Sequence, residues 1–265
     1  MDRPPCALSI AGSDSVAGAG IQADLKTFAA LGVYGASVVT AVTAQNTIGV
    51  AAIFPLAPEA VAAQLEAVAQ DLPFRAVKTG MLATGEIVEI VAKKVGQFRL
   101  PNLVVDPVMA AHDGTPLLDS QGVEALRRLL LPLATVVTPN LQEAAMLIGH
   151  PVRTRDEMEE AARQIASMGP RVVVVKGGHL EREEAVDVVF HDGRVRLLVA
   201  PRLEGVAAHG TGCVFASAIA AGLAQGLGVW EAVRRAKELV TQALHHRYMV
   251  GRGKALLFVP GQGCA

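Results

Sequence analysis

The chain alternates short hydrophobic runs with longer amphipathic segments. Near-continuous apolar runs are typical of strands covered on both faces, and apolar residues at helical spacing are typical of packed helices. The apolar runs predict strands at 7–11, 37–40, 76–79, 103–106, 135–138 and 172–176. The amphipathic segments predict helices at 20–31, 58–70, 85–97, 120–131, 142–147 and 155–168. Such alternation predicts an α/β fold with a mostly parallel sheet and right-handed crossovers.

The pattern changes in the C-terminal half of the chain. Two β-rich runs, at 185–190 and 195–199, flank His191-Asp192-Gly193-Arg194 and predict an antiparallel hairpin around a glycine turn. Two more helices are predicted at 211–225 and 229–249. No repeat, low-complexity tract or linker interrupts the sequence, so we expect a single domain over residues 1–265.

The composition limits the classes of protein to which the chain can belong. Hydrophobic residues make up 51% and aromatic residues 4%, and 24 Lys+Arg against 25 Asp+Glu give a formal charge of −1. These values argue against disorder, and the lack of clustered basic residues argues against nucleic-acid binding. Three cysteines, Cys6, Cys213 and Cys264, do not suggest a disulfide framework, and the first residues lack a signal region. We therefore expect a cytoplasmic protein.

Two long stretches, 27–58 and 205–230, contain no Asp, Glu, Lys or Arg. Each is long enough to cross a membrane, which takes about 20 apolar residues. Glycines and polar residues interrupt both stretches, among them Gln45-Asn46 in the first and His209 in the second. We therefore expect two buried segments that contain polar groups, and no membrane partner.

Polar or glycine-rich residues follow most of the predicted strands. In an open α/β sheet, ligands bind beyond the carboxyl ends of the strands, so these residues predict one shared site. They are Gly12-Ser13-Asp14, Thr79-Gly80-Met81, Asp106-Pro107-Val108-Met109, Thr138-Pro139-Asn140 and Lys176-Gly177-Gly178-His179.

The sequence His209-Gly210-Thr211-Gly212-Cys213 opens a helix of small residues. Glycines there let the backbone approach a ligand, and the free N–H groups and helix dipole favour an anion, such as a phosphoryl group in transfer. Cys213 lies in the first turn of the helix, where the pKa of a thiol should be lowered. The alternative is a glycine-rich helix start with a buried cysteine that acts as a small hydrophobic residue.

Two further segments carry candidate ligand-binding residues with open alternatives. The turn Gly18-Ala19-Gly20 matches no familiar nucleotide fingerprint, and Asp24, one turn later, either contacts a ligand or satisfies the helix dipole. Gln45 carries a primary amide that can recognise the donor/acceptor edge of an aminated heterocycle. The alternative for Gln45 is a hydrogen bond within its own loop.

Asp106, Asn140, Glu143 and Lys176 form a third candidate group. Asn140 and Glu143 are three residues apart and share a helix face, and Asn140 also fits an N-cap. Asp106 and Glu143 could hold Mg²⁺, mostly through water, because Mg²⁺ prefers a few carboxylates together with substrate phosphates. Lys176 ends a buried strand, so we expect it to meet either a phosphate or a neighbouring carboxylate. His150, His245 and His246 lack the spacing of a zinc site, and we expect them to be surface or packing residues.

Together these motifs resemble the ribokinase-like superfamily, and within it the hydroxymethylpyrimidine/phosphomethylpyrimidine kinases of thiamin biosynthesis. The resemblance extends from Ala7 to about Lys254 and includes the motifs above in the family's order, together with Thr43-Ala44-Gln45-Asn46-Thr47 and Lys78-Thr79-Gly80-Met81-Leu82. It implies a three-layer αβα fold with a mostly parallel central sheet and an antiparallel hairpin in the C-terminal half. It also implies a homodimer.

The resemblance implies ATP-dependent phosphorylation of 4-amino-5-hydroxymethyl-2-methylpyrimidine and then of its monophosphate, with Mg²⁺. Gln45 would contact the aminopyrimidine edge, and the other substrate-binding residues would be Gly12, Gly20, Asp24, Met81 and Val108. The catalytic residues would be Gly210, Thr211, Gly212, Cys213 and Lys176. Many sugar kinases of the superfamily carry a catalytic Asp at the position of Cys213. Asp106, Asn140, Glu143, Lys176 and Gly178 fall where the family handles Mg²⁺ and nucleotide phosphates.

Three segments depart from the family pattern. Ser15-Val16-Ala17 replaces a Pro-Ser-Gly-like turn, Ala207-Ala208 replaces an Asn-Thr-like pair, and Ala111-His112-Asp113-Gly114 replaces a Lys-Ser-Gly-like flap. None of them includes Gln45 or Cys213. Two other functions stay open, a pyridoxine/pyridoxal kinase of the same branch and a non-catalytic nucleotide or metabolite sensor. Gln45 favours the aminopyrimidine over pyridoxal, and the intact glycine turn argues against a sensor.

Overall fold

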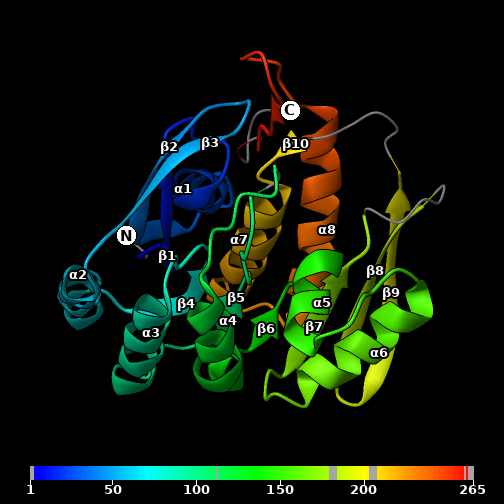
Figure 1. Ribbon diagram of the computed structural model, residues 1–265, viewed down its shortest axis with the longest axis horizontal. Coiled ribbons are helices and arrows are strands. Elements are labelled where there is room, and N and C mark those ends of the chain that lie inside the picture. The colour runs from blue at the N-terminus through cyan, green and yellow to red at the C-terminus, as the bar shows by residue number, and fades with distance from the viewer. Residues whose placement is uncertain (1–2, 112, 179–183, 203–207, 260, 262–265) are drawn as a thin grey trace.

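Alternating side chains of the parallel strands pack against two different helix layers. A computed structural model describes residues 3–111, 113–178, 184–202, 208–259 and 261. In these ranges a nine-stranded sheet has the order β3-β2-β1-β4-β5-β6-β7-β8-β9, with helices on both faces (Figure 1). The parallel strands are β1 (Cys6–Asp14), β2 (Tyr34–Gln45), β4 (Phe74–Thr79), β5 (Leu103–Val105), β6 (Val136–Val137) and β7 (Val172–Lys176). The predicted fold class is confirmed.

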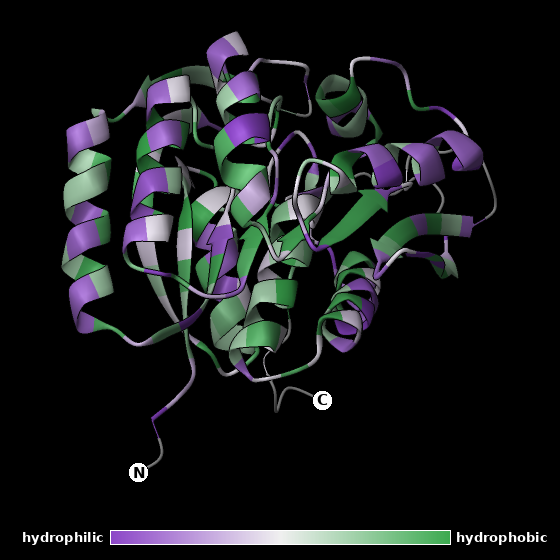
Figure 2. Ribbon diagram, turned by 90° about the horizontal axis from the view of Figure 1, so that it is seen from below, coloured by the Kyte–Doolittle hydropathy of each residue, from purple (hydrophilic) through white to green (hydrophobic). Residues whose placement is uncertain are grey.

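Among the described residues, five helices cover one face of the sheet and three cover the other. Leu8, Val77 and Val105 belong to the core beneath the first layer, whereas Ala7 and Val104 belong to the core beneath the second. The first layer contains α2 (Pro58–Asp71), α3 (Gly85–Gln97), α4 (Ser120–Ala125), α5 (Leu141–Ile148) and α6 (Arg155–Ala166). The second contains α1 (Gly20–Ala30), α7 (Thr211–Ala224) and α8 (Val229–His245). Figure 2 shows helices with a polar and an apolar side around a mostly hydrophobic sheet.

The predicted hairpin is present, and an antiparallel pair at the opposite edge of the sheet was not predicted. β8 (Glu184–His191) and β9 (Arg194–Pro201) form the hairpin at one edge of the sheet. At the other edge, β3 (Val50–Pro55) pairs antiparallel with β2. β3 is itself a short apolar run that ends in proline, but it lies within the charge-free stretch at 27–58 and was not separated from it at the level of the sequence. A small parallel pair, β10 (Ala208–His209) and β11 (Ala255–Leu256), was also missed, because each strand has only two residues.

Two predicted helices end earlier than expected. The helix predicted at 120–131 consists of α4, a π-helical turn (Leu126–Leu130) and a 3-10 turn (Leu131–Leu133) that contains Pro132. The helix predicted to reach residue 249 ends at His245. Every helix in the described ranges is too short or too polar to span a bilayer. In the second charge-free stretch, Val214 to Ala224 of α7 are buried, as expected for this stretch.

Candidate active site

The carboxyl ends of the parallel strands open into one cavity of about 1060 Å³. Residues from five predicted strand tips line it, so the structure brings these tips together at one cavity. They are Gly12, Asp14, Met81, Asp106, Val108, Asn140, Lys176 and Gly178. Gln45 from β2 and residues 210–213 at the start of α7 line the same cavity. Pockets that bind drug-sized ligands measure roughly 300–1,000 Å³, so this cavity has room for a nucleotide beside a small heterocycle.

Residues 210–213 form a glycine turn from which α7 begins. Gly210 has a φ of 87°, and a Cβ at this position would overlap the carbonyl oxygen of Gly18. The first helical hydrogen bond runs from the Val214 N–H to the Gly210 oxygen, so the N–H groups of Thr211, Gly212 and Cys213 precede the helical ladder. This 210–213 turn has the features of an anion-binding helix start.

Gly212 brings this turn against an ion pair. A Cβ on Gly212 would lie 3.1 Å from Lys176 Nζ and 3.5 Å from Asp106 Oδ2. Lys176 Nζ lies 3.2 Å from Asp106 Oδ1, and the Thr138 hydroxyl donates a hydrogen bond to the same oxygen over 3.2 Å. The carboxylate alternative for Lys176 is therefore present in this structure. The ammonium group also faces the glycine turn, where an anionic ligand would reach it.

Asn140 and Glu143 form a complete capping box at the start of α5. The Glu143 N–H donates to Asn140 Oδ1 over 2.8 Å, and the Asn140 N–H donates to Glu143 Oε2 over 2.7 Å. The N-cap interpretation of Asn140 is confirmed. Burial raises the pKa of Glu143 to about 7, with Lys176 opposing and Asp106 adding to the effect. Burial also acts to lower the pKa of Lys176, but the charges of Asp106 and Glu143 outweigh it and raise the pKa.

Asp106 and Glu143 fit a weakly coordinated magnesium ion. In the described part of the chain, no cluster of three or more His, Cys, Asp or Glu side chains could hold a metal by itself. Mg²⁺ commonly uses one or two carboxylates and takes its remaining ligands from water and substrate phosphates. Burial is the largest cause of the raised pKa of Glu143, and Lys176 offsets it only in part, so a divalent cation would add positive charge where the site has room for it.

Cys213 lies in the first turn of α7, but the expectation of a lowered pKa is wrong. Burial raises the pKa of the Cys213 thiol to about 12. Lys78 and the Gly20 N–H act in the opposite direction, whereas the charges of Asp24 and Asp106 raise the value further. Desolvation therefore outweighs the helix start, and the thiol keeps its proton at neutral pH.

Asp24, which the resemblance placed among the substrate-binding residues, lies behind the cavity wall. Its side chain is fully buried and lies 2.8 Å from Lys78 Nζ, and the hydroxyl groups of Ser9 and Ser217 donate to it over 2.6 and 2.7 Å. Asp24 is absent from the cavity lining, whereas Lys78 is part of it. Asp24 therefore supports the cavity wall from behind through Lys78, and a direct substrate contact is not available to it.

The remaining predicted substrate residues line the cavity. Gly12 is close to Met81, because a Cβ on Gly12 would lie 3.1 Å from Met81 Sδ. Met81 and Val108 provide apolar surface, and Gly20 lies beside Cys213 at the start of α1. Gln45 Nε2 lies 3.0 Å from His209 Nε2, and Gln45 Oε1 lies 3.1 Å from Thr43 Oγ1.

Asp14, Lys78 and His209 also line the cavity, although none of them was assigned a role of its own from the sequence. Lys78 had a usable signal, because a lysine inside a short apolar strand must find a buried partner.

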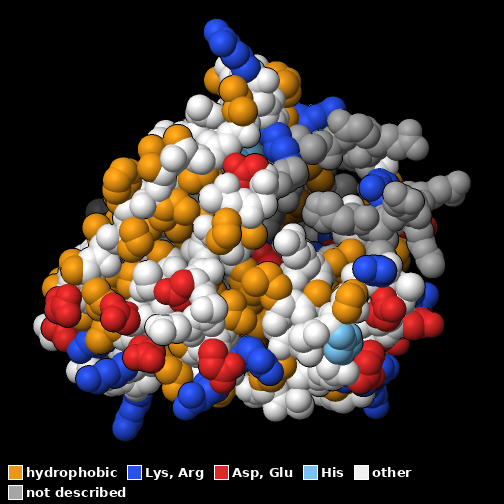
Figure 3. Space-filling view, viewed as in Figure 1, with side chains coloured by type: hydrophobic (Ala, Val, Ile, Leu, Met, Phe, Trp, Pro, Cys, Tyr) orange, Lys and Arg blue, Asp and Glu red, His pale blue; other side chains and the backbone are white. Residues whose placement is uncertain are grey.

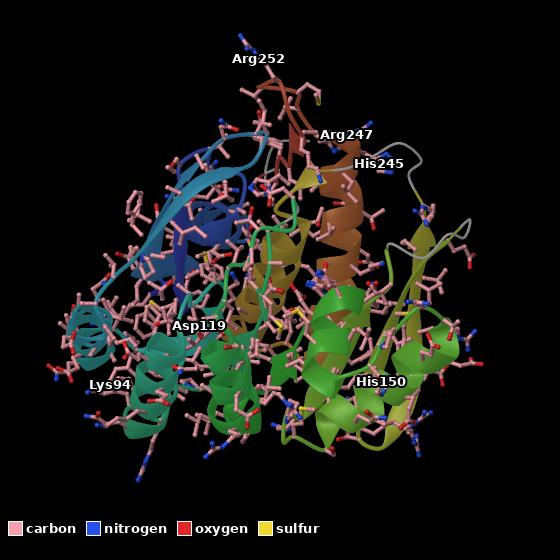
Figure 4. The ribbon with its side chains drawn as sticks, viewed as in Figure 1. Lys94, Asp119, His150, His245, Arg247 and Arg252 are labelled. Carbon is pink, nitrogen blue, oxygen red and sulfur yellow. The ribbon has the colours of Figure 1, made fainter. Side chains whose placement is uncertain are left out.

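His150 and His245 lie on the outside at opposite ends of the molecule (Figure 4). His112, His179, Ala207 and Cys264 from the sequence analysis lie outside the described residues.

A comparison with protein families identifies one match. A family model described as phosphomethylpyrimidine kinase matches residues 14–257. The chain belongs to this kinase family. It is 49% identical to the hydroxymethylpyrimidine/phosphomethylpyrimidine kinase of Streptomyces coelicolor over 94% of this chain and 92% of that protein.

Two other similar proteins differ from the Streptomyces coelicolor kinase, one in its length and the other in its name. The chain is 48% identical to a thiamine biosynthesis bifunctional protein of Geobacter sulfurreducens over 93% of its own length, but spans only 50% of that protein. The crystal structure of an ADP complex of Bacillus subtilis pyridoxal kinase is 38% identical, with a TM-score of 0.90 over 97% of this chain and 98% of that one. Similarity to both kinds of kinase makes the acceptor substrate the main question about the site.

Proposed function

We propose that this chain uses Mg²⁺-ATP to phosphorylate 4-amino-5-hydroxymethyl-2-methylpyrimidine, and then its monophosphate, in thiamin biosynthesis. The observation that carries the proposal is that Gln45 and the 210–213 turn line the same cavity. The amide can hydrogen-bond to an aminopyrimidine edge, while the N–H groups of the turn stabilise the phosphoryl group in transfer. The name of the Streptomyces coelicolor relative supports the same substrate.

Each step of the proposed reaction is an in-line displacement at the γ-phosphorus of ATP. The hydroxymethyl oxygen attacks first, its proton is released, and the bond from phosphorus to the bridging oxygen of ADP breaks. In the second step a phosphate oxygen of the monophosphate attacks, and this oxygen is already anionic. Phosphoryl transfer depends mainly on positioning and electrostatic stabilisation, so neither step requires a preformed thiolate.

Different residues of the cavity stabilise different charges of the reactants. The N–H groups of Thr211, Gly212 and Cys213 bind the transferred phosphoryl group, and Lys176 reaches the phosphates next to Gly212. Asp106 and Glu143 would hold Mg²⁺, mostly through water. When bound, this ion neutralises negative charge on the phosphates. Cys213 contributes its backbone N–H and a protonated side chain that shapes the site, because the pKa of the thiol is raised to about 12.

The test is coupled ADP release with Mg²⁺-ATP and three acceptors in parallel. The acceptors are the hydroxymethylpyrimidine, its monophosphate and pyridoxal. We expect turnover on both pyrimidines and little on pyridoxal. Turnover mainly on pyridoxal would overturn the proposed substrate while leaving the phosphoryl-transfer site in place. ATP binding without turnover on any of the three would favour a sensor.

Pyridoxal kinase is the second candidate function. The similarity to the Bacillus subtilis pyridoxal kinase favours it, and both acceptors are hydroxymethyl heterocycles of similar size. Gln45 favours the aminopyrimidine, because its amide can match an amino group and a ring nitrogen together. A purely sensing role is disfavoured, because binding alone does not require Lys176 and the 210–213 turn to converge on one point.

We also propose that the enzyme is a cytoplasmic homodimer. Hydrophobic side chains gather on the flank formed by β2 and β3 (Figure 3), where Val42, Ile48 and Phe54 are exposed at the edge of the sheet. Exposed apolar side chains at an edge strand commonly mark an interface. The free thiols of Cys6 and Cys213 are compatible with a reducing compartment. Light scattering should give twice the chain mass, and Phe54→Lys should shift it toward the monomer.

A further inference from the structure

His209 connects the 210–213 turn to the residue proposed to recognise the heterocycle. It ends β10, directly before Gly210, and its Nε2 lies near two polar atoms. Asp14 Oδ2 is 3.1 Å away and Gln45 Nε2 is 3.0 Å away. One ring nitrogen therefore meets both a carboxylate and a primary amide, and its protonation decides what each of them can do.

Asp14 fixes the proton on this nitrogen. Its Oδ2 also accepts hydrogen bonds from the Gly18 and Ala19 N–H groups over 3.0 and 2.8 Å, and its Oδ1 accepts one from the Val16 N–H over 3.0 Å. Burial acts to raise the pKa of Asp14, but these bonds and the contact with His209 outweigh it and lower the pKa. The carboxylate is therefore ionised and can only accept, so the favourable partner is a protonated Nε2 of His209.

A proton on Nε2 of His209 determines the orientation of the Gln45 amide. If the amide nitrogen faced this N–H, two donors would meet at 3.0 Å. A half-turn about the bond between Cγ and Cδ exchanges the amide oxygen and nitrogen and leaves the other atoms in place. The oxygen then shares the single N–H of His209 Nε2 with Asp14 Oδ2 in a three-centre hydrogen bond, and the nitrogen donates to Thr43 Oγ1 over the same 3.1 Å contact. Thr43 can accept, because its own proton goes to the Ser13 carbonyl oxygen at 3.1 Å.

The imidazole ring has little freedom to change this arrangement. A Cβ on Gly18 would lie only 2.6 Å from His209 Cδ2, so Gly18 and the ring are in close contact. The backbone of β10 is held by its parallel pairing with β11, in which His209 is opposite Leu256. The side chain is 18% exposed. Close packing on one side and Asp14 on the other hold the ring in place.

We propose that His209 is a positioning residue that holds the Gln45 amide in one orientation and thereby determines which heterocycle the site prefers. The inference rests on the proposed function. A fixed amide presents an oxygen and an N–H in a set order, which suits a ring with an amino group beside a ring nitrogen. A free amide can turn over and accept a ring that carries a hydroxyl group instead. His209 therefore favours the aminopyrimidine over pyridoxal.

The first test compares acceptor preference in His209 variants. His209→Phe keeps a flat ring without the N–H, His209→Asn retains an N–H donor, and the surface variant His150→Phe is the control. We measure kcat and KM for the hydroxymethylpyrimidine, for pyridoxal and for ATP, with Kd replacing kcat/KM for an acceptor without turnover. One lost hydrogen bond is worth about three- to tenfold, so the pyrimidine preference should fall by about that factor in His209→Phe.

The remaining results separate this role from a purely structural one. We expect KM for ATP to be unchanged in His209→Phe, and part of the preference to return in His209→Asn. Equal losses on both acceptors would overturn the proposal. If the wild-type chain does not phosphorylate the pyrimidine at all, the proposed function fails instead.

A measurement without substrate tests the proton position directly. Long-range ¹⁵N–¹H spectra of the full chain distinguish the imidazole tautomers, with His209→Phe used to assign the signal. We expect Nε2 of His209 to carry a proton, and Asp14→Asn to change that signal. An unprotonated Nε2 would overturn the proposal whatever the kinetics show.

Discussion

Lys78 and Asp24 form an ion pair with both side chains completely buried, and removing one partner provides a quantitative test of the structure. Lys78 Nζ lies 3.0 and 2.8 Å from the two carboxylate oxygens of Asp24. The informative change is Lys78→Met, which keeps the length and apolar character of the side chain and removes the charge. It leaves the carboxylate of Asp24 buried with two hydroxyl donors, Ser9 and Ser217.

The expected loss of stability follows from the charge that is left behind. Breaking a buried ion pair on one side typically costs about 3–5 kcal/mol. The free energy of unfolding of a domain is about 5–15 kcal/mol in total, so the variant should be severely destabilised but can still fold.

Urea denaturation followed by circular dichroism measures this loss. The double variant Lys78→Met with Asp24→Asn removes both charges, so it should be more stable than Lys78→Met alone. Arg127→Met serves as the control, because it breaks an exposed pair with Glu124 whose side chains are 42% and 55% accessible. Such pairs contribute about 0–1 kcal/mol.

Two outcomes would refute the reasoning. If Lys78→Met lost no more stability than Arg127→Met, the pair would not be desolvated as the structure shows. If the double variant were less stable than Lys78→Met, the stranded charge would not be the cause of the loss.

Three further predictions concern the active site. Cys213→Ala should slow both phosphorylations by similar factors below about 100-fold, because a lost catalytic base would cost about 10²–10⁴-fold and the thiol of Cys213 is not one. Single-turnover rates measure each step, and a failure of the first step alone would show that Cys213 acts as a base. Glu143→Gln keeps the capping box and removes a group whose pKa is raised from 4.5 to about 7. Folded protein retains that proton while unfolded chain loses it, so wild-type stability falls across this window as pH rises. In urea titrations without metal, the free energy of unfolding of Glu143→Gln should exceed that of the wild-type chain by up to about 3 kcal/mol near pH 8 and by little near pH 5. An equal difference at both pH values would contradict this. Gly210→Ala should destabilise far more than Gly226→Ala in the same titrations, since both have φ near 87–88° but only Gly210 would meet another backbone. Equal losses of stability would show that the positive φ alone, and not the contact with another backbone segment, causes the effect.

The sheet and the position of the cavity could be predicted because they depend on local patterns. The predicted strand at 172–176 coincides with β7, and the polar residues after the strands lie together at one edge. Parallel strands place their carboxyl ends side by side, so a pattern of strands and tips is sufficient to locate the site. The antiparallel pairing of β3 with β2 could not be predicted in this way, because it comes from the tertiary structure.

The contacts within the site were harder to predict, because they join distant parts of the chain. Lys78 and Asp24 are 54 residues apart, and His209 and Asp14 are 195 apart. The sequence suggested that Asp24 either contacts a ligand or satisfies a helix dipole, and it did not suggest the buried ion pair with Lys78 that the structure shows. The pKa of Cys213 was predicted in the wrong direction for a related reason. A helix start can be recognised in the sequence, whereas the desolvation that outweighs it depends on how the whole site packs.

The measurement that tests the central claim most directly is a ³¹P NMR time course. The chain is incubated with Mg²⁺-ATP and 4-amino-5-hydroxymethyl-2-methylpyrimidine, and the phosphorus signals of the pyrimidine products are followed. We predict that a monophosphate signal appears first and then gives way to the paired signals of a diphosphate, as ATP is converted to ADP. Consumption of ATP without a phosphorylated pyrimidine, or no reaction while pyridoxal is phosphorylated, would contradict the account.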